Sequence, residues 1–296
     1  MNSTNDIEWQ VKGVLPNTSI PELPPTTNEI RYAINTNTFN TRKWITKIET
    51  DEQLAKNLSS IFQKDYYTGQ TPIKSINQAI QRLGEEGFWC VVLEDALNQT
   101  FYNSPSFPEW RPALRYLQKY NLYFAHLCRI IARNTSVSSH EAFQAGLLQN
   151  IGRVIALREQ EYKRKYNELQ VIWDAISLVH PLIGTYAIRI WGLDKNTQRA
   201  ILNQGQVYFN NKPHTLSAIL VLSQNLLSQM GKECSGPANW VEKSSIPSSK
   251  STLHKDIPIV PSASMEDALA ILDMEKKELS KIGKEFAKTL KSLRLM

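Results

Sequence analysis

Two neutral amides, Gln149 and Asn150, stand side by side in the middle of an apolar stretch, residues 138–157. Amide side chains donate and accept hydrogen bonds, but they carry no charge and seldom ligate transition metals. Buried amides of this kind either read the polar groups of a ligand or hydrogen-bond each other across a core. The doublet therefore predicts hydrogen bonding, to a ligand or within the protein, and not metal chemistry.

The stretch around the doublet has the pattern of an amphipathic helix, and we expect one continuous helix over residues 138–157. Ser138 and Glu141 have the spacing of a capping box, in which each side chain bonds a backbone N–H at the helix start. Gly146 and Gly152 cost helix stability, but they allow a neighbouring backbone to come close. The apolar face is expected to comprise Leu147, Leu148, Ile151, Val154 and Ile155.

Other side chains that could act chemically are scattered along the sequence. Cys90, Cys128 and Cys234 have no CxxC spacing, which argues against a zinc site or a disulfide framework and fits a reducing cytoplasm. There is no Walker P-loop and no glycine-rich dinucleotide fingerprint. His126 and His180 lie in expected helices, and the simplest interpretation of each is a hydrogen-bonded core histidine.

Composition favours a globular protein of the cytoplasm. Hydrophobic residues make up 42% of the 296 residues and charged residues 21%, as in proteins with a sizeable core. The net charge of +6 is mildly basic, which is less than a dedicated nucleic-acid binder carries. No apolar run approaches the ~20 residues of a membrane span, and the N-terminal residues lack the pattern of a secretory signal.

Hydrophobic periodicity predicts an all-α protein. Four segments are expected: an extended leader (1–26), a helical domain (27–232) with an N-terminal lobe (27–107) and a core (108–232), a linker (233–262) and a C-terminal amphipathic helix (263–296). Helices are expected over residues 28–36, 51–64, 76–83, 87–97, 113–134, 138–157, 168–191, 197–203, 215–230 and 264–293.

Two segments resemble the HDOD ("HD-related output domain") family, a branch of the HD superfamily of metal phosphohydrolases. Residues 145–154, AGLLQNIGRV, are similar to the motif A-G-L-L-x-x-I-G-x-V, in which the HD superfamily places a metal-binding His-Asp doublet. Residues 73–84, IKSINQAIQRLG, are similar to the HDOD signature I-x-S-I-x-x-A-I-x-x-L-G, with Ser75 as the helix cap. The Asn-Ser that usually precedes this signature is absent. The resemblance extends over roughly residues 27–232 and implies an HD-like five-helix core.

The resemblance also implies a degenerate metal site. The four ligand positions of the superfamily correspond here to Tyr120, Gln149, Asn150 and Gln224, the last with a register that can shift by one residue. None of these supplies the imidazole or carboxylate that holds a hydrolytic metal. We therefore expect no bound metal, no cofactor and no phosphohydrolase activity. His180 is the retained imidazole of this region.

Three functions remain as hypotheses. The first is a non-catalytic module of bacterial signal transduction that works through contacts with protein partners of unknown identity. The second is a sensor of a nucleotide or cyclic dinucleotide, bound in the vacated pocket by Gln149, Asn150, Arg153, His180 and Gln204. The third is a residual metal-dependent phosphohydrolase that uses His126 and His180 as displaced ligands.

The C-terminal amphipathic helix allows two roles. Its apolar stripe can pack back on the domain, or it can bind a partner helix or a second copy of the chain. Its other face is rich in lysine, which suits anionic lipid or nucleic acid. Glutamates interleave with the lysines in the sequence, and they argue against both of these anionic partners.

Overall fold

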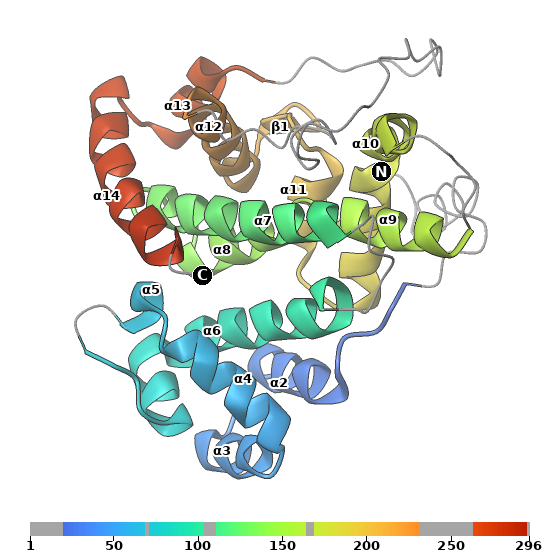
Figure 1. Cartoon of the computed structure of the whole chain (residues 1–296). Coiled ribbons are helices and arrows are strands. Elements are labelled where there is room, and N and C mark those ends of the chain that lie inside the picture. The colour runs from blue at the N-terminus through green and yellow to red at the C-terminus, as the bar shows by residue number, and fades with distance from the viewer. Residues whose placement is uncertain (1–19, 69–70, 104–110, 164–168, 231–262, 295–296) are drawn as a thin grey trace. The chain divides into compact units, whose positions relative to one another are not determined.

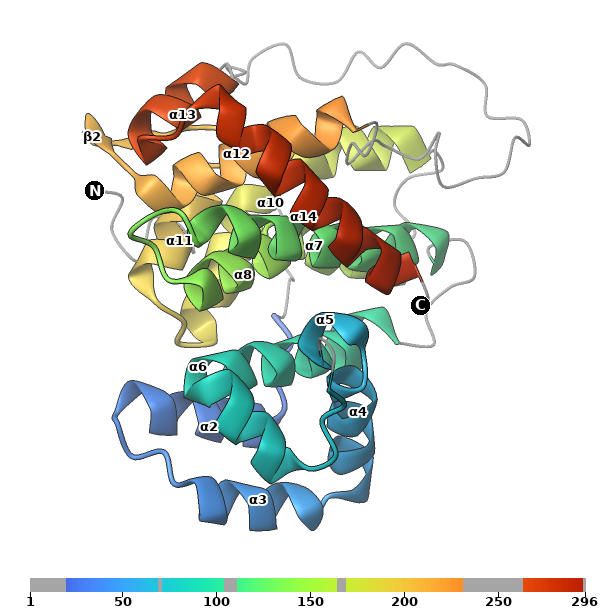
Figure 2. The same ribbon diagram turned by 90° about the vertical axis from the view of Figure 1, so that its left-hand side faces the viewer.

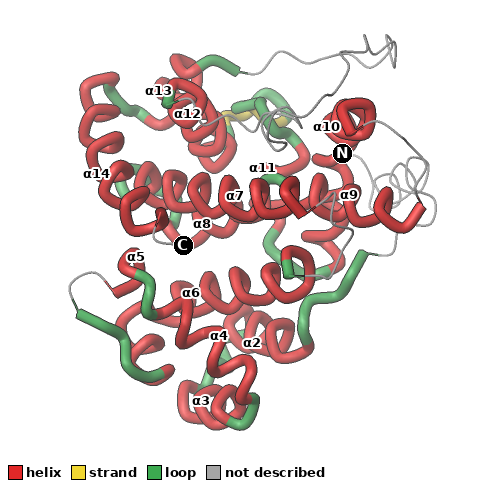
Figure 3. Tube along the Cα trace, viewed as in Figure 1, coloured by secondary structure: helices red, strands yellow, loops and turns green. Residues whose placement is uncertain are grey.

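The described residues are almost entirely helical, and the predicted all-α fold is confirmed (Figure 3). The computed structural model describes residues 20–68, 71–103, 111–163, 169–230 and 263–294. The leader and the linker expected from the sequence fall mostly outside these ranges. None of the described helices combines the length and the apolar composition that crossing a membrane requires. The chain forms two compact units, one within residues 104–276 and one of residues 21–103 with 277–296.

The smaller unit is organised around α6 (Ile76–Leu97), against which α2 (Pro25–Asn35), α3 (Thr41–Glu49) and α4 (Glu52–Phe62) pack (Figure 1). The short helix α5 (Asp65–Thr68) follows α4, and the π-helical turn η1 (Asn98–Tyr102) follows α6. Helix α3 was not expected from the sequence, although Asn40 caps its first turn and Trp44 and Ile48 are its buried apolar residues. Two buried positions in nine residues are too few for periodicity to detect.

Two local predictions about this unit are confirmed. The Ser75 hydroxyl accepts a hydrogen bond from the Gln78 N–H at 3.1 Å and so begins α6. Gly84 interrupts α6 with a φ of 69°, a left-handed conformation that glycine adopts without steric cost. The second half of α6 is buried on nearly all sides, because Phe88, Trp89 and the residues after them fill the core of this unit.

Asp95 is a buried carboxylate in the second half of α6, with 4% of its surface exposed. Burial raises the pKa of Asp95 to about 6, although hydrogen bonds from Gln99 and Asn57 oppose this shift. Because the folded-state pKa lies above the unfolded value, the folded protein favours the neutral carboxyl. Stability is therefore lost as the pH rises from about 4 to about 6, and the ionised group costs stability at pH 7.

The Asp95→Asn variant is expected to be more stable than the wild type at pH 7 by about 2 kcal/mol, because the amide removes the buried charge. The difference should disappear below about pH 3, where Asp95 is protonated in both the folded and the unfolded state. Urea denaturation at the two pH values measures it. Glu49→Gln, at an exposed position, is the control and should change stability little at either pH. A variant that is less stable than the wild type at pH 7 would contradict this account of Asp95.

The described residues of the larger unit form seven helices, α7 to α13, together with one short hairpin. Helix α7 packs on α8, α9 on α10, α10 on α11, and α12 on α7, α8 and α13 (Figure 2). Their bounds are α7 Arg111–Ala132, α8 Ser139–Leu148, α9 Ile151–Lys163, α10 Leu169–Ile190, α11 Lys195–Leu202, α12 Thr215–Gln229 and α13 Met265–Leu272. The hairpin consists of β1 (Tyr208–Phe209) and β2 (Lys212–Pro213).

The continuous helix expected over residues 138–157 is in fact two helices, α8 and α9, which are separated by Gln149 and Asn150. The expected capping box at its start is also different. Ser138 accepts from the His140 N–H at 3.3 Å, while the Glu141 carboxylate accepts from the Asn196 side chain at 2.6 Å. Glu141 therefore joins α8 to the start of α11.

Both glycines of this region allow close helix crossings, as predicted. A Cβ atom on Gly146 would lie 2.7 Å from the Cα of Ala125 in α7, and one on Gly152 would lie 1.9 Å from the carbonyl oxygen of His180 in α10. The first glycine thus sets the spacing of α7 and α8, and the second that of α9 and α10. The break at the amide doublet lies between these two crossings.

The C-terminal segment is also two helices, where the sequence predicted one. Helix α13 begins with a capping box of Ser264 and Asp267, and it ends where Asp273 adopts a left-handed conformation. Helix α14 (Lys276–Arg294) follows, and it carries most of the expected apolar stripe. The buried residues of this stripe are Ile282, Phe286, Leu290 and Leu293.

Candidate functional site

Asn150 is the centre of a buried polar cluster at the junction of α8 and α9. Its side-chain N–H donates to the Oδ1 atom of Asn121, on α7, at 2.8 Å. Its own Oδ1 atom accepts a hydrogen bond from the guanidinium of Arg153. Asn121 and Asn150 are 0% and 1% exposed, so their amides are satisfied by the protein and not by bulk water.

Arg153 extends this cluster to α10. Its guanidinium lies 5.0 Å from the centre of the Trp173 ring, within the range of a cation–π contact. Burial first, and then the positive charge of Arg153, hold the pKa of His180 well below its usual value. His180 is therefore a neutral imidazole at physiological pH, one that can donate or accept but carries no charge.

Gln149 has a different environment from its neighbour. Its backbone carbonyl accepts a hydrogen bond from the side chain of Gln204, at the end of α11. Its side-chain Oε1 atom is buried and has no hydrogen-bond partner among the described residues, and the same holds for the Nδ1 atom of His180. A buried polar atom without a partner costs free energy, and it is available to a bound water or ligand.

Tyr120 and Gln224, which were also expected at the degenerate metal site, have different surroundings from the amide doublet. Tyr120 is buried, but its ring stacks on Phe124 with the ring centres 5.9 Å apart, and the neighbouring residue Asn121 is the one that contacts Asn150. Gln224 is exposed. The preceding residue in α12, Ser223, is the buried one, and its hydroxyl accepts a hydrogen bond from the Cys128 thiol at 3.2 Å. The exposed side chain of Gln224 therefore does not face the buried cluster around Asn150.

Asn121 is the member of the cluster that sequence reasoning missed. It lies between Tyr120 and Leu122 in a helix whose neighbouring positions are mostly apolar and buried. A single polar residue on such a face is a signal of a buried hydrogen bond. The family resemblance instead places the ligand position at its neighbour Tyr120. In the structure, Asn121 is the residue of α7 whose side chain contacts Asn150.

His126 does not take part in this cluster through any described contact. Its Nδ1 atom accepts a hydrogen bond from Arg129 at 2.8 Å, and its ring packs edge-on against Phe143 with the ring centres 5.1 Å apart. These contacts join successive turns of α7 to α8. They match the simpler expectation for this residue, a hydrogen-bonded core histidine.

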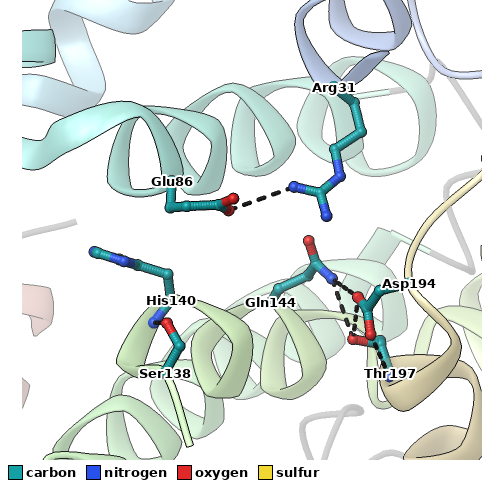
Figure 4. A network of polar contacts seen from close by, with 7 residues as sticks. All are labelled: Arg31, Glu86, Ser138, His140, Gln144, Asp194 and Thr197. Atoms are coloured by element: carbon teal, nitrogen blue, oxygen red, sulfur yellow. Dashed lines mark hydrogen bonds and ion pairs between the residues drawn. The ribbon is translucent and has the colours of Figure 1, made fainter. Parts of the chain in front are cut away.

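A second polar network fixes the start of α11 (Figure 4). Asp194 caps this helix by accepting from the Thr197 N–H at 2.7 Å, and it also accepts from the Gln144 side chain of α8 at 2.7 Å. Gln144 is buried and donates as well to the Thr197 hydroxyl at 3.1 Å. Asp194 therefore holds α11 against α8. This network is structural, since no buried side-chain nitrogen or oxygen of Gln144, Asp194 or Thr197 lacks a hydrogen-bond partner.

The side chains of the Asn150 cluster do not fit the divalent metal ion that the HD superfamily binds. Both polar atoms of the Asn150 amide are already engaged, and one of them accepts from the Arg153 guanidinium. A positive charge at this position repels a cation, and amides lack the negative charge that holds one. Within the part of the chain that the structure describes, no three His, Cys, Asp or Glu side chains gather as metal ligands do.

Comparison with known proteins agrees with the fold described above. A model of the HDOD domain family matches residues 20–207. No curated protein matches the sequence.

Three solved structures are similar to this chain at identities that show the fold alone. An HDOD domain protein of unknown function from Geobacter sulfurreducens is 16% identical, with a TM-score of 0.67 over 98% of this chain and 96% of that one. A candidate signal transduction protein from Marinobacter aquaeolei VT8 is 14% identical, with a TM-score of 0.66 over 99% of this chain, which spans 65% of that protein. A candidate phosphohydrolase from Shewanella amazonensis SB2B is 14% identical, with a TM-score of 0.62 over 97% of this chain and 95% of that one.

Proposed function

Because the chain belongs to the HDOD domain family, we propose that it is a non-catalytic module of bacterial signal transduction, which acts by binding partner proteins. HDOD domains are related to the HD phosphohydrolases. In those enzymes a metal acidifies a bound water and stabilises charge on the phosphoryl oxygens. The proposal is that this chain keeps the helical scaffold of these enzymes and has lost their metal-dependent hydrolytic activity.

One observation carries this proposal. The Asn150 amide, which the family resemblance places at the position of the metal-binding aspartate, donates to Asn121 and accepts from Arg153. A carboxylate that bound a metal would need its lone pairs free and its surroundings negative. Here the lone pairs face a guanidinium, and the next ligand position is a second neutral amide. The cluster is suited to joining α7, α9 and α10, and not to activating water.

Purified protein is expected to contain less than about 0.1 metal ion per chain, because no described set of ligands can be deprotonated to hold one. It should also fail to hydrolyse nucleotides or phosphate esters in the presence of Mn²⁺, Mg²⁺ or Fe²⁺. Elemental analysis and a phosphate-release assay measure the two quantities. Stoichiometric metal would contradict the proposal and favour the residual hydrolase. Hydrolytic activity that requires one of these metal ions and disappears in His180→Ala would do the same. Variant His126→Ala tests the other displaced ligand in the same way.

A positive test of the proposal is affinity capture from a lysate of the source organism. The full chain serves as bait beside a chain that ends at residue 262, and captured proteins are quantified by mass spectrometry. A specific protein retained by the first bait and lost from the second would place the contact on residues 263–296. Capture of no protein above background by either bait would argue against a module that acts through partners.

The sensor remains a second candidate, and it is favoured by the two buried polar atoms without described partners, Oε1 of Gln149 and Nδ1 of His180. Gln204, Asn150 and Arg153 complete the set that was expected to read a nucleotide. A thermal-shift screen with nucleotides and cyclic dinucleotides tests it, since a ligand that binds the folded state raises the melting temperature. Flat melting curves over the panel count against the sensor. A shift that is abolished in Gln149→Leu supports it.

A further inference from the structure

His214 lies where four segments of the larger unit meet. Its backbone N–H donates to the Val207 carbonyl at 2.8 Å and closes the base of the hairpin. The Nδ1 atom of its ring lies 3.3 Å from the Ser217 backbone nitrogen and 2.7 Å from the Ser217 hydroxyl, and so it caps the first turn of α12. Its Nε2 atom lies 2.6 Å from the Oδ1 atom of Asn196 on α11. Asn196 in turn donates to the Glu141 carboxylate of α8 at 2.6 Å.

These contacts fix which ring nitrogen of His214 carries the proton. A backbone N–H can only donate, so the Nδ1 atom must offer a lone pair to Ser217. The neutral ring then carries its proton on Nε2 and donates it to the Asn196 amide oxygen. The orientation of this amide is consistent, because its nitrogen faces Glu141, whose ionised carboxylate can only accept. A second proton, on Nδ1, would leave the bond to Asn196 in place and would remove the bond from the Ser217 N–H.

The surroundings of the His214 ring oppose a positive charge. The N-terminus of α12 is the positive end of a helix dipole, and this helix has no ionisable side chain between Thr215 and Gln229. Burial first, and then the positive charge of Arg199 on α11, lower the pKa of His214. Glu141 has the opposite charge, but its described contact with the ring runs through the Asn196 amide.

The other acidic groups on α11 and α13 and at their starts are engaged elsewhere. Asp194 caps α11, Glu266 pairs with Lys276, and Asp267 caps α13. Basic or titratable side chains of the neighbouring elements include Arg129 on α7, His140 on α8, Lys195 on α11 and Lys212 on the hairpin. None of these adds negative charge near the ring. The environment therefore favours the neutral, capping form.

We propose that His214 is a pH-sensitive cap, whose protonation releases the first turn of α12 and the base of the hairpin. The Ser217 N–H would then face an N–H of the ring in place of a lone pair. The hairpin would open with the helix, because β2 leads directly into His214 and the His214 N–H closes the hairpin base. This conformational change is internal to the larger unit and is independent of the proposed function.

The direction of the pH effect follows from the difference between the two forms of the junction. In the open form the imidazole titrates near its ordinary pKa of about 6.5, and in the capped form the pKa of His214 is lower. The cap therefore contributes fully above about pH 6.5, and its contribution is lost as the pH falls below that value. At about pH 5.5 the open form holds its proton about ten times out of eleven, so opening is favoured by about tenfold at most.

Hydrogen exchange of the full chain measures this opening. The readouts are the protection factors of the His214 and Ser217 amides, whose bonds define the closed form. Both should fall several-fold between about pH 7.5 and about pH 5.5, after correction for the intrinsic pH dependence of exchange. Asp95 titrates in the same range, but its protonation stabilises the fold and cannot imitate a loss of protection. Ring nitrogen chemical shifts at the higher pH give the tautomer, which should carry its proton on Nε2.

Variant His214→Asn keeps a side chain that caps a helix and cannot be protonated, so its protection at Ser217 should not change between the two pH values. Variant Ser217→Ala is the matched control. It removes the hydroxyl but keeps the backbone N–H that Nδ1 accepts, and it should retain the pH response of the wild type. Circular dichroism and thermal melting at the higher pH establish that both variants are folded. The tautomer and the exchange of the wild type require no variant.

Each outcome decides the proposal. A ring that carries its proton on Nδ1 at the higher pH would overturn it, since the cap bond would then not exist. Constant protection of the wild type at the two pH values would do the same, as would an equal loss of protection in His214→Asn. Disappearance of the pH response in Ser217→Ala would assign the effect to the hydroxyl and not to the backbone cap. None of these results bears on metal binding or hydrolysis.

Discussion

Replacement of Gly152 by alanine is expected to destabilise the protein by about 3–5 kcal/mol, or to prevent its folding. The added Cβ would lie 1.9 Å from the carbonyl oxygen of His180 and 2.7 Å from the backbone nitrogen of Gly184. These are backbone atoms, which cannot rotate away as the end of a side chain can. Helices α9 and α10 would have to separate, and the contact between Arg153 and Trp173 would be strained with them.

The matched control is Gly283→Ala, because Gly283 is also helical and a Cβ there would meet no atom within 4 Å. Alanine has the higher helix propensity, so this variant should be more stable than the wild type by about 0.5–1 kcal/mol. Urea denaturation followed by circular dichroism gives both free energies of unfolding. If the two alanine variants were equally stable, the close crossing of α9 and α10 would not exist as described.

The second large effect is expected at the Asn121–Asn150 pair. Asn150→Ala removes a buried hydrogen bond of 2.8 Å and also an acceptor of the Arg153 guanidinium. Asn121→Ala removes the same bond from its other side. Each variant is expected to lose about 2–3 kcal/mol, because each leaves a buried polar group without a partner. The double variant should lose less than the sum by about 1 kcal/mol or more, because the bond can be lost only once.

Asn225→Ala serves as the comparison, since the Asn225 side chain only donates to the Val221 carbonyl within its own helix, at 2.9 Å. Its loss should stay below about 1 kcal/mol. The four unfolding free energies of the double-mutant cycle are measured by urea denaturation at one pH. Strict additivity of the two asparagine variants would mean that their amides do not interact, and the assignment of Asn121 to the site would have to be withdrawn.

Several features of the fold could be predicted from the sequence because their causes lie within a few residues. Ser75 and Asp51 cap α6 and α4 through backbone N–H groups three residues ahead, and Ser264 with Asp267 does so for α13. Gly84 interrupts α6 through its own backbone conformation. Periodicity identified most of the long helices, because each has an apolar face of several turns.

The two wrong helix predictions have a cause that lies outside the local sequence. Residues 138–157 and 264–293 each have the periodicity of one helix, yet both are broken, at Gln149–Asn150 and at Asp273. Periodicity registers which residues are apolar, and it is almost unchanged by a break of two or three residues. The first break places Asn150 where it can reach Asn121 on a different helix, a hydrogen bond that no local pattern encodes.

The properties of the candidate site can likewise be separated into those set by local sequence and those set by tertiary packing. The sequence by itself determined that Gln149 and Asn150 are neutral amides in an apolar helical region and that Gly152 serves a close crossing, because residue type alone sets charge and bulk. Only the tertiary structure decided that Asn121 and Arg153 are the partners of Asn150 and that Gln224 is exposed. Asn121 and Asn150 are 29 positions apart in the chain. Their contact depends on how α7 is rotated against the start of α9, and that rotation is set by the packing of both helices and not by either sequence segment alone.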